Sequence, residues 1–390
     1  MEPVAATRDE FYKLIQDTQL QLNRFYPLVG RIEESDLINC RGDTLAKNDA
    51  PAHVLANYDL IFEDTFNGQL REENWNTRFL WGPDRIINDE DQYYVDVLGG
   101  SGWQGNDPFT FSAEGNLQIN AEPIDPGGPQ TAAFNQVTGQ TDAQPLSSGI
   151  ITTRDTCNFR YGYCEVCLKD PCCPSGMWTA AWLLNSLYYS NAFTKNEAER
   201  GDGSLGNDKW NPEIDFKESV DNYGCDGTVK NAYHYFTGDG NAPSYHLWSL
   251  DGGNFRQVDV GQGGLVSQFN TYPTCDGSFI FNLPDTPITG CSEFHTVAVD
   301  WAPEYIHYYV NGILVNCVNQ PNIVTDQTMY LLINFAAGGG FPFGTGPGGA
   351  AAQTVDLNDY PATLEVDYAR IYLHPEGRAS NVQGNVLVNK

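Results

Sequence analysis

Basic residues are scarce in this sequence. Its 390 residues include 21 Lys and Arg against 50 Asp and Glu, which gives a formal net charge of −29. A field of that sign repels nucleic acids, phosphate-rich surfaces and sulfated polysaccharides, whereas a neutral polymer is tolerated. The charge therefore argues against nucleic-acid partners. It equally suits a protein that has to stay soluble in a salty medium.

Long apolar runs are also missing. No segment approaches the length of a membrane span, and the first ten residues have neither the basic region nor the apolar region of a signal peptide. We therefore expect no membrane span and no conventional signal peptide. The ten cysteines, an even number, nevertheless favour an oxidising compartment. We expect the protein outside a cell or on the surface of a cell or particle, by an unknown route.

Disulfides are the default expectation for these cysteines, and a zinc site is the alternative. Cys164, Cys167, Cys172 and Cys173 lie close enough in sequence to supply four thiolates. In an alternating strand, however, Cys164 and Cys167 point to opposite faces, and a tetrahedral zinc site needs converging ligands. The disulfide pairing itself does not follow from the sequence.

Turn-forming and aromatic residues are plentiful, with 39 Gly, 22 Pro, 21 Tyr and 20 Phe. This composition, with few long helical periodicities, favours an all-β protein of one large or two smaller domains. Residues 1–57 differ, because apolar residues between Phe11 and Phe25 recur near helical spacing. They predict an N-terminal arm with an amphipathic helix. This helix either packs on the main domain or docks to another protein chain.

Three acids in one apolar segment are the strongest functional signal. Glu213, Asp215 and Glu218 alternate with Ile214 and Phe216, which predicts a strand. Alternation puts Glu213 and Asp215 on one face and Glu218 on the other. A single β-bulge would return Glu218 to the first face, and bulges are common beside active sites. Three acids on one face disfavour each other's ionised forms, so the pattern favours catalysis over stability.

Tryptophans near this strand are candidates for sugar binding. Trp178 and Trp182 are four residues apart and would share a strand face. An indole ring offers a flat apolar surface to the C–H face of a pyranose, although buried core tryptophans are the alternative. Trp210 directly precedes the acidic strand. Trp103, in the Gly-rich segment 99–105, is either a sugar platform or an anchor of its own loop.

The acidic segment resembles a known family. Glu213-Ile-Asp-Phe-Lys-Glu218 is similar to the E-x-D-x-x-E signature of glycoside hydrolase family 16, in the bulged form of laminarinase-like members. Further segments resemble the family in the same order between residues 58 and 373. Among these are Gly176–Leu184, with Thr179 where proline is usual, Phe294–Gly312 with an Asn-Gly turn, Tyr330–Gly339 with Asn334, and Leu364–Tyr372 with Asp367.

The resemblance implies a concanavalin A-like jelly roll of two antiparallel sheets with a concave substrate cleft over residues 58–373. The arm of residues 1–57 precedes it and a tail of residues 374–390 follows. The resemblance also implies a retaining mechanism, in which Glu213 is the nucleophile, Glu218 the acid/base and Asp215 lies between them. Together with the charge and the tryptophans, it favours endo-hydrolysis of a neutral β-glucan, above all laminarin-type β-1,3-glucan.

Two further roles come from the resemblance. His234 stands where the family places a cleft-reaching His or aromatic residue, although a lone His is more often structural, and Asn334 is a candidate for substrate binding. Many relatives hold a calcium ion with an acid near the opening strand and the Asp of the closing strand. Asp367 fits the second position and Thr65 does not fit the first. No cofactor is required, and a structural calcium ion is an open alternative.

Three alternative functions share this fold or these residues. The first is a glycan-binding structural component of a large assembly, such as a virion or a cell-surface layer. The second is a transglycosylase, which would use the same nucleophile and acid/base. The third is an agar-type galactan hydrolase. The complete set of three acids favours hydrolysis over binding alone, because a pure binding module does not need crowded carboxylates.

Overall fold

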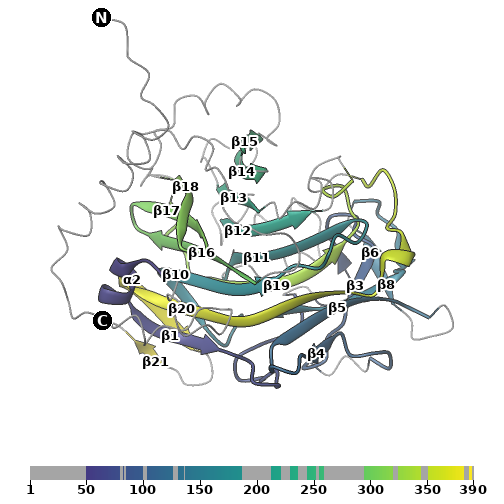
Figure 1. Cartoon of the computed structure of the whole chain (residues 1–390), viewed down its shortest axis with the longest axis horizontal. Coiled ribbons are helices and arrows are strands. Elements are labelled where there is room, and N and C mark those ends of the chain that lie inside the picture. Colours follow the sequence, from purple (N-terminus) through teal and green to yellow (C-terminus); the bar gives the residue numbers. More distant parts are fainter. Residues whose placement is uncertain are drawn as a thin grey trace, which may run out of the picture.

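Two layers of β-strands form the body of the protein, with β11 (Met177–Asn185) and β12 (Glu213–Val220) above β20 (Ala362–Asn381) in Figure 1. The computed structural model describes residues 50–79, 82, 85–99, 103–125, 131–135, 137–186, 212–220, 229–235, 244–251, 254–258, 294–318, 324–343, 350–381 and 386–388. The predicted helix between Phe11 and Phe25 lies outside these residues. No helix within the described ranges is long and apolar enough to cross a membrane.

The inner sheet carries the acidic segment. Its strands pair antiparallel in the order β9-β19-β11-β12-β13-β14-β15. The strands are β9 (Ile150–Thr152), β11 (Met177–Asn185), β12 (Glu213–Val220), β13 (Lys230–Tyr235), β14 (Ser244–Asp251), β15 (Asn254–Val258) and β19 (Met329–Ala337). The acidic strand β12 thus has neighbours on both sides.

The outer sheet is organised around two long strands, β10 (Asn158–Lys169) and β20 (Ala362–Asn381). Beyond β10 follow β16, β17 and β18, and beyond β20 lie β1 and β5 on successive parts of its length. The additional strands are β1 (Asp59–Asp64), β4 (Phe109–Phe111), β5 (Leu117–Pro123), β16 (His295–Ala302), β17 (Tyr305–Val310), β18 (Ile313–Val318) and β21 (Val386–Val388). The layers join where Phe159 of β10 pairs with Met329 of β19. Strand β20 continues past residue 373, where the sequence places the end of the jelly roll.

Short elements complete the described structure. A three-stranded ribbon is formed by β2 (Arg85–Ile86), β6 (Ala132–Asn135) and β7 (Thr141–Ala143). Strands β3 (Gln92–Tyr94) and β8 (Leu146–Ser148) pair in parallel, as do β2 and β6, which are exceptions to the predicted antiparallel pattern. The helices are α2 (Ala52–Asn57) and a 3-10 turn at Leu357–Asp359.

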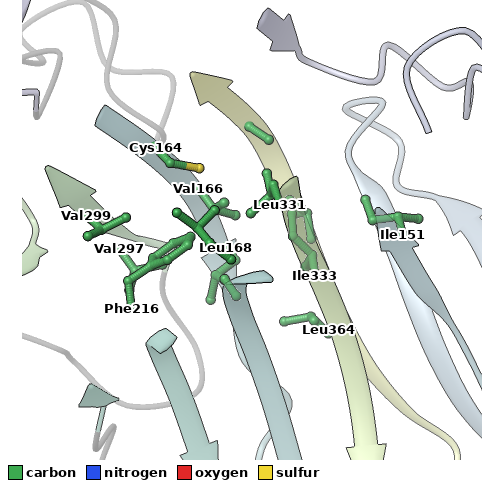
Figure 2. Close-up of a cluster of buried hydrophobic side chains, with 14 of the residues drawn as sticks. Ile151, Cys164, Val166, Leu168, Phe216, Val297, Val299, Leu331, Ile333 and Leu364 are labelled. Carbon is green, nitrogen blue, oxygen red and sulfur yellow. The ribbon is translucent and has the colours of Figure 1, made fainter. Parts of the chain in front are cut away.

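The main core lies between the two layers. Figure 2 shows side chains of β10, β16 and β19 converging there with Phe216 of β12. Alternation explains which residues enter it: on β19, Leu331 and Ile333 point into this core, while Leu332 and Asn334 lie on the opposite face. The predicted jelly-roll sandwich is therefore confirmed.

Two local expectations are also confirmed. The Asn311-Gly312 turn joins β17 to β18, with φ of 48° and 71°, as a tight hairpin turn between strands requires. Cys164 lies in the main core, whereas Cys167 packs with Tyr368 on the outer side of the sheet. The two thiols therefore point to opposite faces of β10, and they do not converge on a metal.

The expectation of disulfides is correct for only part of the described cysteines. Cys172 and Cys173 are each disulfide-bonded. Cys157, Cys164 and Cys167 carry buried thiols instead. The apolar core around Cys157 and Cys164 accounts for this, because cysteine there packs as a small hydrophobic side chain.

Candidate active site

Strand β12 contains the predicted bulge. On one side, Ala181 and Trp182 of β11 pair with Lys217 and Asp215, so Phe216 is the extra residue. On the other side, Asp215 pairs with Ala232 of β13 and Glu218 pairs with Lys230. The stretch of β12 between these pairs is therefore one residue longer than the stretch of β13. Two residues of β12 therefore oppose one position of each neighbouring strand. A bulge of this kind shifts the alternation by one residue.

The bulge brings the three acids to one face of the inner sheet. Ile214 and Phe216 are fully buried in the main core. Asp215 is 4% exposed and Glu218 is 8% exposed, and Glu213 is only partly buried. We call the surface that carries Asp215 and Glu218, together with Trp178, Trp182 and Asn334, the acid face. An unbulged strand would have turned Glu218 into the core instead.

The environment of Asp215 strongly perturbs its ionisation. Burial raises its pKa well above the usual value of 3.8, and the neighbouring charge of Glu218 raises it further. A hydrogen bond with the side chain of Glu213 acts in the opposite direction. Asp215 is therefore protonated well above the pH at which an exposed Asp ionises.

Both predicted sugar-binding tryptophans of β11 lie on the acid face, where they are largely buried. Trp178 is 7% exposed and Trp182 is 8% exposed. The Trp178 indole Nε1 donates to Glu218 Oε1 at 2.9 Å, and its ring packs edge-on against Phe341. Trp178 thus holds one of the acids in place. Trp178 makes these contacts through the edge of its ring, and the ring is not broadly exposed for stacking on a sugar.

A second hydrogen-bonded chain runs beside the acids. Trp182 Nε1 donates to Asn334 Oδ1 at 2.8 Å, and Asn334 Nδ2 donates to the hydroxyl of Tyr94 at 2.9 Å. Phe79 packs against both Tyr94 and Trp182. Sequence reasoning named Trp182 and Asn334 but missed Tyr94. The adjacent Tyr93-Tyr94 pair in a strand-like segment was the available signal, since one of two successive strand residues has to face inward.

The remaining predicted residues fall in three places. The backbone of His234 pairs directly with that of Glu213, which puts this residue beside the nucleophile candidate in register. Trp103 stacks on Tyr93, with ring centroids 5.7 Å apart, and its Nε1 donates to the carbonyl of Asn106. Trp210 lies outside the described residues.

The acidic residues at the expected calcium position have hydrogen-bond partners within the protein. Burial raises the pKa of Asp367 to about 6, and its carboxyl group accepts a hydrogen bond from Cys167. On the opening strand, Glu63 accepts from Arg370, and Asp64 accepts from the side chains of Arg71, Asn74 and Trp75. Across the described part of the chain, no three His, Cys, Asp or Glu side chains are grouped as a metal would need. No step of the mechanism below involves a metal.

A sandwich of two β-layers with carboxyl groups in the middle of one sheet defines a jelly-roll protein. None of the protein-family models matches the chain. Solved structures nevertheless share its fold. SCLam, described as a non-specific endo-beta-1,3(4)-glucanase from family GH16, matches 83% of this chain and 92% of its own at 22% identity and a TM-score of 0.50. The laminarinase from Rhodothermus marinus matches 81% and 97%, also at 22% identity and 0.50.

Curated relatives agree with these structures. Glucan endo-1,3-beta-glucosidase A1 of Niallia circulans is 25% identical over 337 residues, which is 82% of this chain and 38% of that protein. The endo-1,3-1,4-beta-glycanase ExsH of Rhizobium meliloti is 25% identical over 286 residues, 71% and 46% respectively. The chain thus spans less than half the length of either protein. A beta-glucanase of Rhodothermus marinus is 24% identical over 301 residues, 73% of this chain and 80% of that one. These findings support the resemblance to laminarinase-like members of glycoside hydrolase family 16.

Proposed function

We propose that the protein is a retaining endo-glycosidase that hydrolyses a neutral β-glucan, with β-1,3-glucan as its main substrate. The observation that carries this proposal is the bulge at Phe216, which brings Glu213, Asp215 and Glu218 to the acid face. Retaining enzymes need two carboxyl groups about 5–5.5 Å apart. Asp215 lies between Glu213 and Glu218 on this face, so the backbones of the two glutamates are about 13 Å apart and their long side chains have to lean toward each other to reach that separation.

Each acid has a distinct role in this mechanism. Glu213 attacks the anomeric carbon and forms the glycosyl-enzyme, while Glu218 donates a proton to the departing glycosidic oxygen. In the second step Glu218 removes a proton from the water that attacks the intermediate, which releases Glu213. Asp215 shares a hydrogen bond with Glu213, and because Asp215 and Glu218 disfavour each other's ionised forms, their proximity favours a proton on the acid/base.

The substrate class rests on charge, on aromatic contacts and on the relatives. The net charge of −29 opposes sulfated galactans, and Trp178 and Trp182 border the acids. The relatives carry the names of enzymes acting on 1,3- or mixed 1,3-1,4-linked glucans. The disulfide-bonded Cys172 and Cys173 suit an oxidising compartment. We therefore place the activity outside the cell or on a surface.

Replacement of the two glutamates tests the proposal. Glu213→Gln and Glu218→Gln should each lower the release of reducing ends from laminarin by about 10²–10⁴-fold. Both should unfold at nearly the wild-type temperature, because the amide keeps the size of the side chain. Glu72→Gln, at an exposed position, is the matched control and should retain full activity. Near-wild-type turnover by either glutamate variant would refute the assignment.

A panel of polysaccharides tests the substrate. Laminarin should be cleaved fastest, mixed-linkage glucan next, and agarose and carrageenan scarcely at all. Early release of oligosaccharides of mixed length would indicate endo-action. Products longer than the starting oligosaccharide would indicate a transglycosylase, and binding to laminarin without any cleavage would indicate a glycan-binding structural protein.

A further inference from the structure

A lysine is buried directly beneath the acid face. Lys217 is 0% exposed and follows the extra residue Phe216 in the bulge. Its Nζ donates to Asp170 Oδ1 at 2.6 Å and to the backbone carbonyl of Thr179 at 3.1 Å. It also donates to the hydroxyl oxygen of Thr179. The ammonium group is therefore held on the interior side of β12, away from the acid face.

These contacts connect the two layers of the sandwich. Asp170 follows the last residue of β10 in the outer sheet, whereas Thr179 belongs to β11 of the inner sheet. The Thr179 hydroxyl donates to Asp170 Oδ1 at 2.5 Å, and His295 Nε2 of β16 lies 3.8 Å from Asp170 Oδ2. Thr179 stands where the resembling family has proline, a residue without a hydroxyl group. Lys217, Asp170 and Thr179 form what we call the anchor cluster.

Stability alone does not account for the anchor cluster. Taking two charges out of water costs several kcal/mol per ion, and well-packed apolar residues in their place are often as stable or more so. The cluster has a specific geometric effect instead. Phe216 and Lys217 are successive residues, yet both point to the interior side of β12. Because both do so, the next residue, Glu218, points to the acid face.

We propose that Lys217 is a positioning residue for Glu218: anchored by Asp170 and Thr179, it holds the bulge that turns Glu218 toward the acid face. This inference rests on the proposed role of Glu218 as acid/base. Lys217 does not touch the substrate, because its side chain lies on the opposite side of the strand.

The charges around Lys217 are consistent with this role. Burial lowers the pKa of Lys217, while Asp170 and, more weakly, Glu218 act to raise it. Asp170 is therefore the main counter-charge of Lys217. On the acid face, Glu218 meets Asp215 of its own strand and the Trp178 indole of β11. The anchor cluster supplies the cation on the interior side.

A comparison of leaving groups tests the proposal on the full chain. Cleavage of laminarin needs a proton from Glu218, whereas a dinitrophenyl β-laminaribioside loses a weakly basic phenolate without one. The ratio kcat/KM reports the first chemical step on both substrates. In Lys217→Met, kcat/KM on laminarin should fall on the order of 100-fold, as expected for a displaced catalytic group. On the aryl substrate it should stay within about threefold.

Two more variants complete the experiment. The double variant Lys217→Met/Asp170→Leu removes both charges, so it can be measured if the single variant does not fold. Its kcat/KM should also fall on laminarin and stay nearly unchanged on the aryl substrate. Lys169→Met removes another lysine, whose Nζ lies 2.5 Å from Glu365 on the outer sheet. This control should lose no activity on either substrate.

The outcomes separate the inference from the proposed function. Equal losses on both substrates, or no loss, in a folded Lys217 variant would overturn the positioning role while the wild-type enzyme remains active. A wild-type protein that cleaves neither substrate would instead overturn the proposed function.

Discussion

Replacement of Asp215 should separate the stability of this protein from its activity. Burial and the charge of Glu218 raise the pKa of Asp215 in the folded state, whereas the unfolded chain has the usual value near 3.8. Between these two values the folded state holds a proton that the unfolded state has released. The free energy of unfolding contributed by this group is therefore largest at low pH, and it decreases as the pH rises.

The size of the effect follows from proton linkage. One proton changes the free energy of unfolding by about 1.4 kcal/mol for each pH unit above the unfolded-state pKa. Asparagine has the same shape and does not titrate. Asp215→Asn should therefore gain stability over the wild type by up to that amount per unit as the pH rises from about 4. The gain stops once the pH passes the folded-state pKa.

Urea unfolding of both proteins at pH 4, 5, 6 and 7 measures this difference. Asp142→Asn, at an exposed position of β7, is the matched control and should show no such trend. Laminarin hydrolysis by Asp215→Asn should fall in the same samples, because the acid that neighbours Glu213 is lost. A difference in the free energy of unfolding that does not change with pH would contradict a raised pKa of Asp215. A wild type that becomes more stable than the variant as the pH rises would contradict it as well.

Two further substitutions test the bulge and the acid face. Phe216→Ala should lower the free energy of unfolding by about 3–5 kcal/mol, since its fully buried ring packs in the main core, and Phe216→Leu should cost less. Urea unfolding decides this, and a loss below about 1 kcal/mol would contradict the packing. Trp178→Phe keeps an aromatic ring beside Phe341 but removes the donor to Glu218. Because a hydrogen bond to a neutral carboxyl group contributes about 0.5–1.5 kcal/mol, laminarin kcat should fall by about 2–13-fold. Trp182→Phe, whose donor meets an amide, should lose less, and equal losses would argue against a specific role for Trp178.

Local patterns in the sequence were sufficient for much of the fold. Alternation of apolar and polar residues identified the acidic strand, and the Asn311-Gly312 pair identified a hairpin turn. The even cysteine count was less informative, because burial of Cys157 and Cys164 in the core depends on packing rather than on number. Patterns of this kind succeed where neighbouring residues alone decide the conformation.

The sequence by itself determined which residues form β12 and that three of them are acids, because strand formation and residue type are local properties. Only the tertiary structure decided where Glu218 points. A bulge exists relative to the strands on both sides, and its register with β11 and β13 involves residues far away in sequence. The burial of Lys217 likewise depends on Asp170, 47 residues earlier. An ammonium group enters a protein interior only where folding brings such a partner to meet it.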